Sequence, residues 1–221
     1  MSMSSIPHTS VNESQREASK AERRQRILDC AREILRQQGH AKLSIRPLAD
    51  AAGVTTPTIY NLIGNKHQIL LALAEDSIRQ LEQAHESSTT TDPIAKAEEV
   101  VNKLVSIYQA DEEYSRQLHL GLEAEALGEY ESNQRGRGRK VAIDDCKTAL
   151  EHGYLNGDID SELLGNRFSS SFHHAQRSWL RGKVDLEGMR REALISCFII
   201  LAADARPRFR QRLFDAIRDL G

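Results

Sequence analysis

The fold is decided by residues 43–75, which read LSIRPLADAAGVTTPTIYNLIGNKHQILLALAE. Apolar side chains recur at helical spacing from Ile45 to Ala52, and a second short segment runs from Thr56 to Leu62 after a glycine. Ser44 and Thr55 are residue types that cap helices, and a proline is tolerated in the first turn of the helix that follows each of them. The pattern predicts two short helices joined by a tight turn.

The flanking residues predict a longer helix on each side of this pair. From Ala21 onward, apolar residues recur at helical spacing until Gly39, which stands where a helix-ending glycine belongs. On the other side, Asn65 and Gln68 have the spacing of a capping box and open a helix that we expect to run to about Glu86. Two short helices packed on a longer first helix constitute a helix-turn-helix unit, whose second short helix reads DNA.

The charge distribution points to the same segment. Residues 16–66 contain ten Lys or Arg against five Asp or Glu, whereas residues 67–221 contain 20 against 26, within a net charge of -2 for the whole chain. A basic segment followed by an acidic body suggests that one end of the molecule meets a polyanion. A solvated charged helix would give the same count, so charge alone does not decide between the two.

The remainder of the chain also predicts helices and no strands. Residues 87–93, SSTTTDP, form a composition break that ends in a cap and a preferred first helical residue. No alternation typical of a strand appears, so the fold class is all-α. Helical spacing is found after the break at Ala97 to Tyr108, Tyr114 to Leu127, Val141 to Leu150, Ser161 to Leu180, Leu186 to Ala203 and beyond Pro207.

Several classes of protein are disfavoured by what the sequence lacks. The longest nearly apolar run, Ala193 to Ala203, is shorter than the roughly 17 to 25 residues of a membrane-spanning helix, and the polar amino terminus does not resemble a secretory signal, so we expect a cytoplasmic protein without membrane contact. Three widely spaced cysteines indicate neither disulfides nor a metal knuckle. His173 and His174 are adjacent and point in different directions on a helix, so we expect no metal and no cofactor.

Residues from about Arg24 to Glu75 resemble the DNA-binding signature of the TetR (tetracycline-repressor-like) family of transcriptional regulators. Two positions depart from the family pattern: Ile63 stands where an aromatic residue is usual, and His67 where an acidic residue is usual. The resemblance rests on Ala49 before Ala52-Gly53-Val54, then Thr58-Ile59-Tyr60, then Asn65-Lys66 and Ile69-Leu70.

The resemblance implies which residues contact DNA. Hydroxyls, lysines and backbone N–H groups at helix starts hold phosphate oxygens, while the first residues of the reader helix face base edges. Each residue taken singly would also fit a capping, stacking or surface role. The bases would be faced by Arg46, Thr56, Pro57 and Asn61, and the phosphates held by Ser44, Thr58, Tyr60 and Lys66, with Thr55 at the start of the reader.

The resemblance also implies a homodimer. One short helix reads only a few base pairs, so specificity calls for two readers about one DNA turn apart, roughly 34 to 36 Å, on a near-palindromic operator. The helices expected at Ser161 to Leu180 and Leu186 to Ala203 would pair with their symmetry mates as a four-helix bundle, and their large apolar surface agrees with a buried interface. The alternative is that they fill the core of one protomer.

The family further implies a pocket for an apolar or amphipathic small molecule, coupled to DNA through the helix that begins at Asn65. The domains are then residues 1–18, a flexible tail; 19–66, the helix-turn-helix domain, with a connecting helix over 66–86; and 87–221, an all-helical domain for effector binding and dimerisation. The run RGRGRK at residues 135–140 suggests a basic surface turn or helix start, or a phosphate site. Candidate ligand contacts are Tyr108, Tyr114, His119, Phe172, His173 and Trp179.

The sequence therefore predicts a DNA-binding repressor that a small molecule releases from its operator. One alternative is a DNA-bound regulator or architectural protein without a small-molecule ligand. Another is an enzyme that uses His119, Glu123 and Glu125 as acid and base groups, but nothing arranges these residues with a nucleophile or a cofactor loop. We therefore expect no enzymatic activity.

Overall fold

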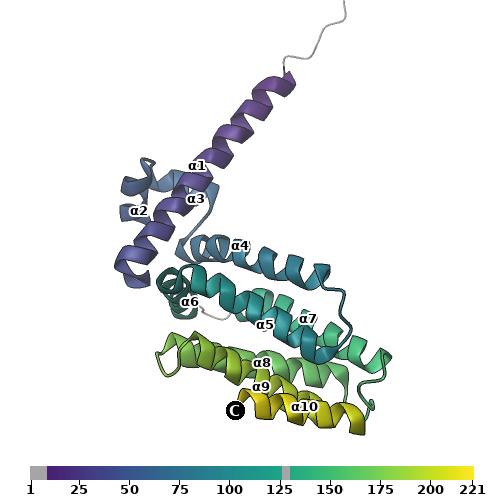
Figure 1. Cartoon of the computed structure of the whole chain (residues 1–221). Helices are drawn as coiled ribbons and strands as arrows, with labels where there is room; N and C mark the ends of the chain where they lie inside the picture. Colours follow the sequence, from purple (N-terminus) through teal and green to yellow (C-terminus); the bar gives the residue numbers. More distant parts are fainter. Residues whose placement is uncertain (1–8, 126–129) are drawn as a thin grey trace, which may run out of the picture.

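The computed structural model describes residues 9–125 and 130–221 (Figure 1). Regular structure in these residues is helical apart from an isolated bridge between Leu155 and Ala205, which confirms the all-α prediction. The elements are α1 Thr9–Gln38, η1 His40–Lys42, α2 Ile45–Ala52, α3 Thr56–Leu62, α4 Lys66–Ser87, α5 Pro93–Ala110, α6 Glu112–Glu125, α7 Tyr130–Glu151, α8 Ser161–Leu180, α9 Leu186–Ala202 and α10 Pro207–Leu220.

The amino-terminal helices pack around a small apolar core. Ile27 and Leu35 of α1, Leu48 of α2 and Ile59 of α3 are each fully shielded from solvent. Such a core fixes the angle between the two short helices, because a shift of either one would open a void. The same cluster includes residues of α4 and α6, so the helix-turn-helix domain and the body share one core where they meet.

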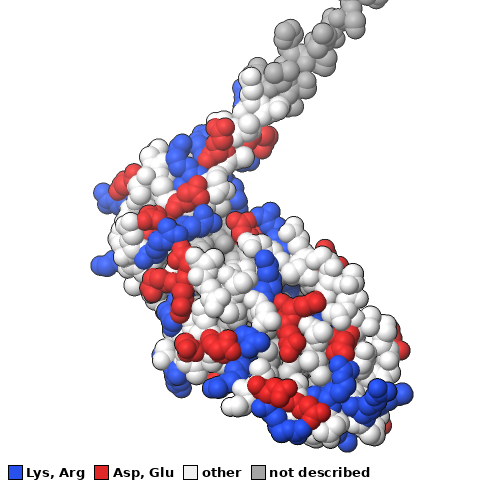
Figure 2. All heavy atoms as spheres, in the orientation of Figure 1, with Lys and Arg blue, Asp and Glu red and all other residues white. Residues whose placement is uncertain are grey.

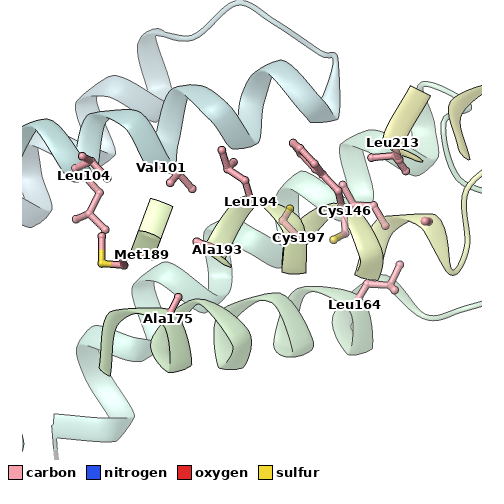
Figure 3. Close-up of a cluster of buried hydrophobic side chains, with 14 of the residues drawn as sticks. Val101, Leu104, Cys146, Leu164, Ala175, Met189, Ala193, Leu194, Cys197 and Leu213 are labelled. Atoms are coloured by element: carbon pink, nitrogen blue, oxygen red, sulfur yellow. The ribbon is translucent and has the colours of Figure 1, made fainter. Parts of the chain in front are cut away.

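A second, larger core lies in the body, where α9 is covered by α5, α8 and α10 (Figure 3). Met189, Ala193, Leu194 and Phe198 of α9 have no exposed surface. A helix that is apolar nearly all round needs neighbours on several sides, as the sequence of this segment predicts.

Helix α1 begins at Thr9, which is earlier than the start at about Ala21 that apolar spacing predicts. Residues 9–18 therefore extend a helix where the sequence analysis expects a tail, and residues 1–8 lie outside the described residues. Residues 14–26 are exposed, so no core marks them in the sequence. Glu, Gln, Lys, Arg and Ala favour helix, and extending an existing helix avoids the cost of nucleation. Figure 1 shows this end of α1 projecting away from the body.

The basic run at residues 135–140 lies inside α7, not at a turn or helix start. Arg137 faces α4, and its guanidinium group binds the carboxylates of Glu75 and Glu82 there. The expected turn is wrong because the two glycines lower helix propensity without preventing a helix, and Arg137 ties this part of α7 to α4.

Among residues 9–125 and 130–221, no helix combines the length and apolar character needed to cross a membrane.

Candidate nucleic-acid interface and internal cavity

The start of α3 is fixed by local hydrogen bonds. The backbone N–H of Thr58 donates to Thr55 Oγ1 at 3.4 Å, and the two hydroxyl oxygens lie 2.8 Å apart. Pro57 occupies the first turn, where its missing N–H costs no helical hydrogen bond. The turn before α3 contains Gly53 at φ 62°, a left-handed conformation that suits glycine. The C-cap of α2 at Gly53 and the N-cap of α3 at Thr55 both follow from the sequence.

The starts of α2 and α4 differ in their capping. Asn65 and Gln68 form the predicted capping box, with Gln68 N donating to Asn65 Oδ1 at 3.0 Å and Asn65 N donating to Gln68 Oε1 at 2.9 Å. Ser44 occupies the N-cap position of α2, but its side chain makes no capping hydrogen bond. The Ser44 residue is exposed, so its hydroxyl is available at the surface.

The residues predicted to contact DNA lie at the start of α2, along α3 and at the start of α4. Tyr60 is 55% exposed although it is a large aromatic residue in a well-packed domain. Ser44, Arg46, Thr55, Pro57 and Asn61 are also exposed, while Thr56, Thr58 and Lys66 are half-buried.

Figure 2 shows Lys and Arg mixed with Asp and Glu over the visible face of this end of the molecule. The basic excess of the segment therefore does not form one uniform patch on that face. Placement of particular side chains, not bulk charge, is what would distinguish this surface as a DNA reader.

Lys66 is engaged with the body of the protein. Its Nζ lies 3.1 Å from Glu125 Oε1 at the end of α6, and both side chains are partly shielded. The lysine that the sequence analysis assigns to a phosphate is thus paired with a carboxylate in this structure. A phosphate would have to replace Glu125 as its partner.

Helix α6 contacts the helix-turn-helix domain through hydrogen bonds as well as through the amino-terminal apolar core that they share. Arg36 Nε of α1 donates to Asp111 Oδ2 at 2.8 Å, just before α6 begins. The backbone N–H of His40 donates to Gln117 Oε1 at 3.0 Å, and His40 Nδ1 lies 2.9 Å from the same oxygen. A displacement of α6 would therefore strain or break these hydrogen bonds to α1 and to His40.

A cavity of about 500 Å³ lies within the body. Its size falls within the range of small-molecule sites, roughly 300 to 1,000 Å³. Aliphatic and aromatic side chains form most of its wall, and the polar groups gather at two ends. The apolar wall includes Ile78, Leu81, Val100, Val101, Leu104, Val141, Ala142, Phe168, Phe172, Ile200 and Leu201.

One polar end of the cavity is formed by α5, α6 and α8. Gln176 Nε2 donates to Tyr108 Oη at 2.6 Å. The ring of His119 meets that of Tyr108 edge-on, with centroids 5.1 Å apart. Burial, and to a lesser extent the neighbouring His173, lowers the pKa of His119 to about 4. His119 is therefore neutral near pH 7.

The other polar end is formed by α4, α5 and α7. His85 Nε2 lies 2.8 Å from Asp145 Oδ1, and Lys96 Nζ donates to the carbonyl oxygen of His85 at 2.8 Å. Arg137 Nε donates to Glu82 Oε1 at 2.7 Å. The charged groups at this end thus already have partners.

Four of the six predicted ligand residues line the cavity: Tyr108, His119, Phe172 and His173. Trp179 is not among the lining residues; it is fully buried, stacks on Tyr108 with centroids 4.9 Å apart, and donates from Nε1 to Glu112 Oε1 at 3.0 Å.

Tyr114 also lies away from the cavity, packed against the amino-terminal core with the Arg32 guanidinium 5.6 Å from its ring centroid. Gln176 lines the cavity but was not predicted. Its spacing from Phe168 and Phe172, at i+8 and i+4, places it on their face of α8 and is the signal that could have found it.

The residues weighed as acid and base groups serve different regions, since Glu125 binds Lys66 while His119 lines the cavity. Cys146 and Cys197 are free thiols on the cavity wall. Burial and nearby Asp145 raise the pKa of Cys146 to about 12, and burial also raises that of Cys197. Within the described residues, no group of three or more His, Cys, Asp or Glu side chains could hold a metal ion.

Comparisons with known proteins define the class. A family model described as bacterial regulatory proteins, tetR family, matches residues 27–73. No curated protein matches the chain. Several solved structures share its fold across most of their length.

A TetR transcription regulator from Haloarcula marismortui superimposes with a TM-score of 0.66 at 18% identity, covering 84% of this chain and 100% of its own. SmeT, the repressor of the Stenotrophomonas maltophilia multidrug efflux pump SmeDEF, superimposes with a TM-score of 0.65 at 18% identity, covering 83% of this chain and 91% of its own. A gamma-butyrolactone receptor (ArpA like protein) superimposes with a TM-score of 0.58 at 15% identity, covering 91% of this chain and 97% of its own.

The α2–α3 unit and the helices around it form a helix-turn-helix domain joined to an all-helical body. The match of residues 27–73 to the tetR family model confirms the resemblance seen in the sequence, and the chain shares its fold with the solved TetR regulator and SmeT structures.

Proposed function

We propose that this protein is a homodimeric transcriptional repressor that binds a near-palindromic DNA operator in the cytoplasm and leaves it when a small molecule fills the internal cavity. The observation that carries the proposal is the α2–turn–α3 unit, whose reader helix begins with exposed polar residues over a buried apolar core. Within the part of the chain that the structure describes, no hydrogen bond or ion pair engages the exposed side chains of Tyr60 and Asn61.

In the proposed complex the reader helix α3 lies in the major groove. Arg46, Thr56, Pro57 and Asn61 face base edges, where an asparagine amide can pair with adenine and an arginine with guanine. The hydroxyls of Ser44, Thr58 and Tyr60 hold phosphates beside the ammonium group of Lys66, and Thr55 caps the helix at the DNA.

Dimerisation is proposed through α8 and α9. Leu163 on α8 and Ile199 on α9 are 47% and 56% exposed, although both helices otherwise contribute to the main core. A twofold interface would bury these side chains and place two readers on one face of the DNA.

Release by a ligand is proposed to run through α6. This helix carries His119 on the cavity wall and contacts the helix-turn-helix domain through Gln117 and Glu125. A coupling of about 1 to 3 kcal/mol would change operator affinity roughly 5- to 150-fold. One structural neighbour is a gamma-butyrolactone receptor, and another is SmeT, seen in a complex with triclosan, and both support a ligand-responsive regulator.

The DNA contacts are tested by fluorescence anisotropy on duplexes over a range of salt concentrations. Lys66→Ala should weaken binding to all sequences and reduce the slope of log K against log salt by about 0.9, the value of one phosphate contact. Asn61→Ala should reduce the preference for the best duplex by about 1 to 3 kcal/mol without changing that slope.

Lys183→Ala is the matched control, because this exposed lysine lies in the turn between α8 and α9, away from the reader. Wild-type affinity and salt dependence in both Lys66→Ala and Asn61→Ala would show that the reader has been assigned to the wrong surface.

A further inference from the structure

The feature that prompts a further inference is His119, which lines the cavity and for which no hydrogen bond is found within residues 9–125 and 130–221. Its ring meets that of Tyr108 edge-on and interacts electrostatically with His173. A neutral imidazole offers one N–H donor and one nitrogen acceptor. Because polar groups in a protein interior are nearly always hydrogen-bonded, this ring on the cavity wall is suited to a partner supplied by a ligand.

The charges of the cavity wall constrain that partner. At the far end, Arg137 is bound to Glu82 and His85 to Asp145. Lys96 at the same end holds the carbonyl oxygen of His85. Beside His119, Tyr108 and Gln176, an ionised group would lose its hydration without a carboxylate, ammonium or guanidinium counter-charge from the described residues around it, which is strongly unfavourable.

The wall between the two ends constrains the rest of the molecule. It is formed by aliphatic side chains and by Phe168 and Phe172, so apolar surface on the ligand would be buried there. The volume of about 500 Å³ accommodates a molecule with two aromatic rings or an equivalent hydrocarbon.

We propose that the cavity takes an uncharged, mainly apolar molecule whose single hydroxyl or carbonyl group hydrogen-bonds with His119 beside Tyr108. The inference rests on the proposed function only for the consequence of binding, release from DNA. Because the pKa of His119 lies near 4, its ring stays neutral over the physiological range and does not attract an anion.

The test uses three probes of one shape: biphenyl, 4-phenylphenol and biphenyl-4-carboxylate. Equilibrium dialysis against the full-length protein at pH 7.5 should give the tightest binding for 4-phenylphenol, weaker binding for biphenyl and the weakest for the carboxylate. His119→Leu should lower the affinity for 4-phenylphenol about 3- to 10-fold, which is the effect of one net hydrogen bond. The affinity for biphenyl should stay within about twofold of that of the wild type. His119→Asn, which keeps a donor and an acceptor, should restore part of the preference for the phenol.

Far-ultraviolet circular dichroism of each variant, measured in the same preparation, reports whether it is folded, and operator binding is measured separately. The inference is overturned if the carboxylate binds as tightly as the phenol, if His119→Leu weakens biphenyl and 4-phenylphenol equally, or if none of the probes binds to folded protein. Binding in the predicted order with no change in operator affinity would support the inference and reject ligand-induced release. If the wild type does not bind DNA while the probes still bind in the predicted order of affinity, only the proposed DNA-reading surface is rejected.

Discussion

At the residue scale, Lys66 has two competing partners. In this structure its ammonium group is 3.1 Å from the Glu125 carboxylate, whereas the proposed DNA complex requires it on a phosphate. The sequence identified the lysine, but it could not identify its partner, because Glu125 lies 59 positions away and joins the site only through the fold.

Removing the competing carboxylate should strengthen DNA binding. Glu125→Gln should raise the affinity for every duplex about 2- to 5-fold, since partly exposed ion pairs contribute roughly 0.2 to 1 kcal/mol. Anisotropy titrations at one salt concentration measure this change. Glu151→Gln, an exposed residue at the end of α7, serves as control for the loss of one negative charge. Unchanged or weaker binding by Glu125→Gln alone would contradict the competition.

His119 should make stability depend on pH. Its pKa is lowered to about 4 in the folded protein from the ordinary histidine value of 6.5. Between these two pH values the unfolded chain therefore binds a proton that the folded chain does not. The stabilisation present above pH 6.5 is therefore lost as the pH falls toward 4. In His119→Leu the free energy of unfolding should fall less steeply with decreasing pH, by up to about 1.4 kcal/mol per pH unit.

Urea unfolding followed by circular dichroism at several pH values from about 7 down to about 5 measures this slope. Parallel slopes for the wild type and His119→Leu would show that His119 is protonated as readily in the folded protein as in the unfolded chain.

At the element scale, helix ends were predictable where the chain carries its own caps. Thr55, Asn65 and Asp92 each accept a backbone hydrogen bond at the start of a helix, as their residue types predict. The starts of α1 and α7 were not predictable in this way. The first is exposed and polar, and the second is followed by Gly136 and Gly138, which suggest a turn but lie within the helix.

The close approach of α7 and α8 depends on Gly165. A Cβ atom added at this buried position would lie 2.7 Å from backbone atoms of Ile143. Gly165→Ala should therefore force the two helices apart and lower the free energy of unfolding by about 1 to 3 kcal/mol, the usual cost of overpacking.

Gly136→Ala on α7 is the matched control, because no atom of the described residues lies within 4 Å of the added atom. It should raise the free energy of unfolding by about 0.4 to 1 kcal/mol, because alanine lowers the entropy of the unfolded chain and favours helix over glycine. Urea denaturation measures both variants. Equal stability of the two would show that α7 and α8 are not in the tight contact described.

At the scale of the whole molecule, the two apolar cores divide the protein into a helix-turn-helix domain and a body, which are joined by α4 and α6. The sequence predicted this division from a motif, a composition break and a change of charge. It did not predict that α6 enters both parts, because the spacing of Leu118 and Leu122 shows that they are buried but not against which helices.

The proposed dimer is tested by placing a charge on its apolar face. Ile199→Arg should convert a dimer into monomers at micromolar concentration, since an unpaired charge in an interface is strongly unfavourable. Phe214→Arg is the control, because Phe214 is 45% exposed on α10, outside the proposed interface. Sedimentation velocity distinguishes the states, and a wild-type sedimentation coefficient for Ile199→Arg would place the interface elsewhere.

The most direct test of the central claim, that α3 reads the major groove once per protomer of a symmetric pair, is selection of bound duplexes from a random library. The enriched sequences should share two inverted half-sites whose centres are separated by about 10 to 10.5 base pairs, one DNA turn. Asn61→Ala should enrich a less constrained version of the same sequence. No enrichment even at low salt, or enrichment of a single half-site without its inverted partner, would contradict the account.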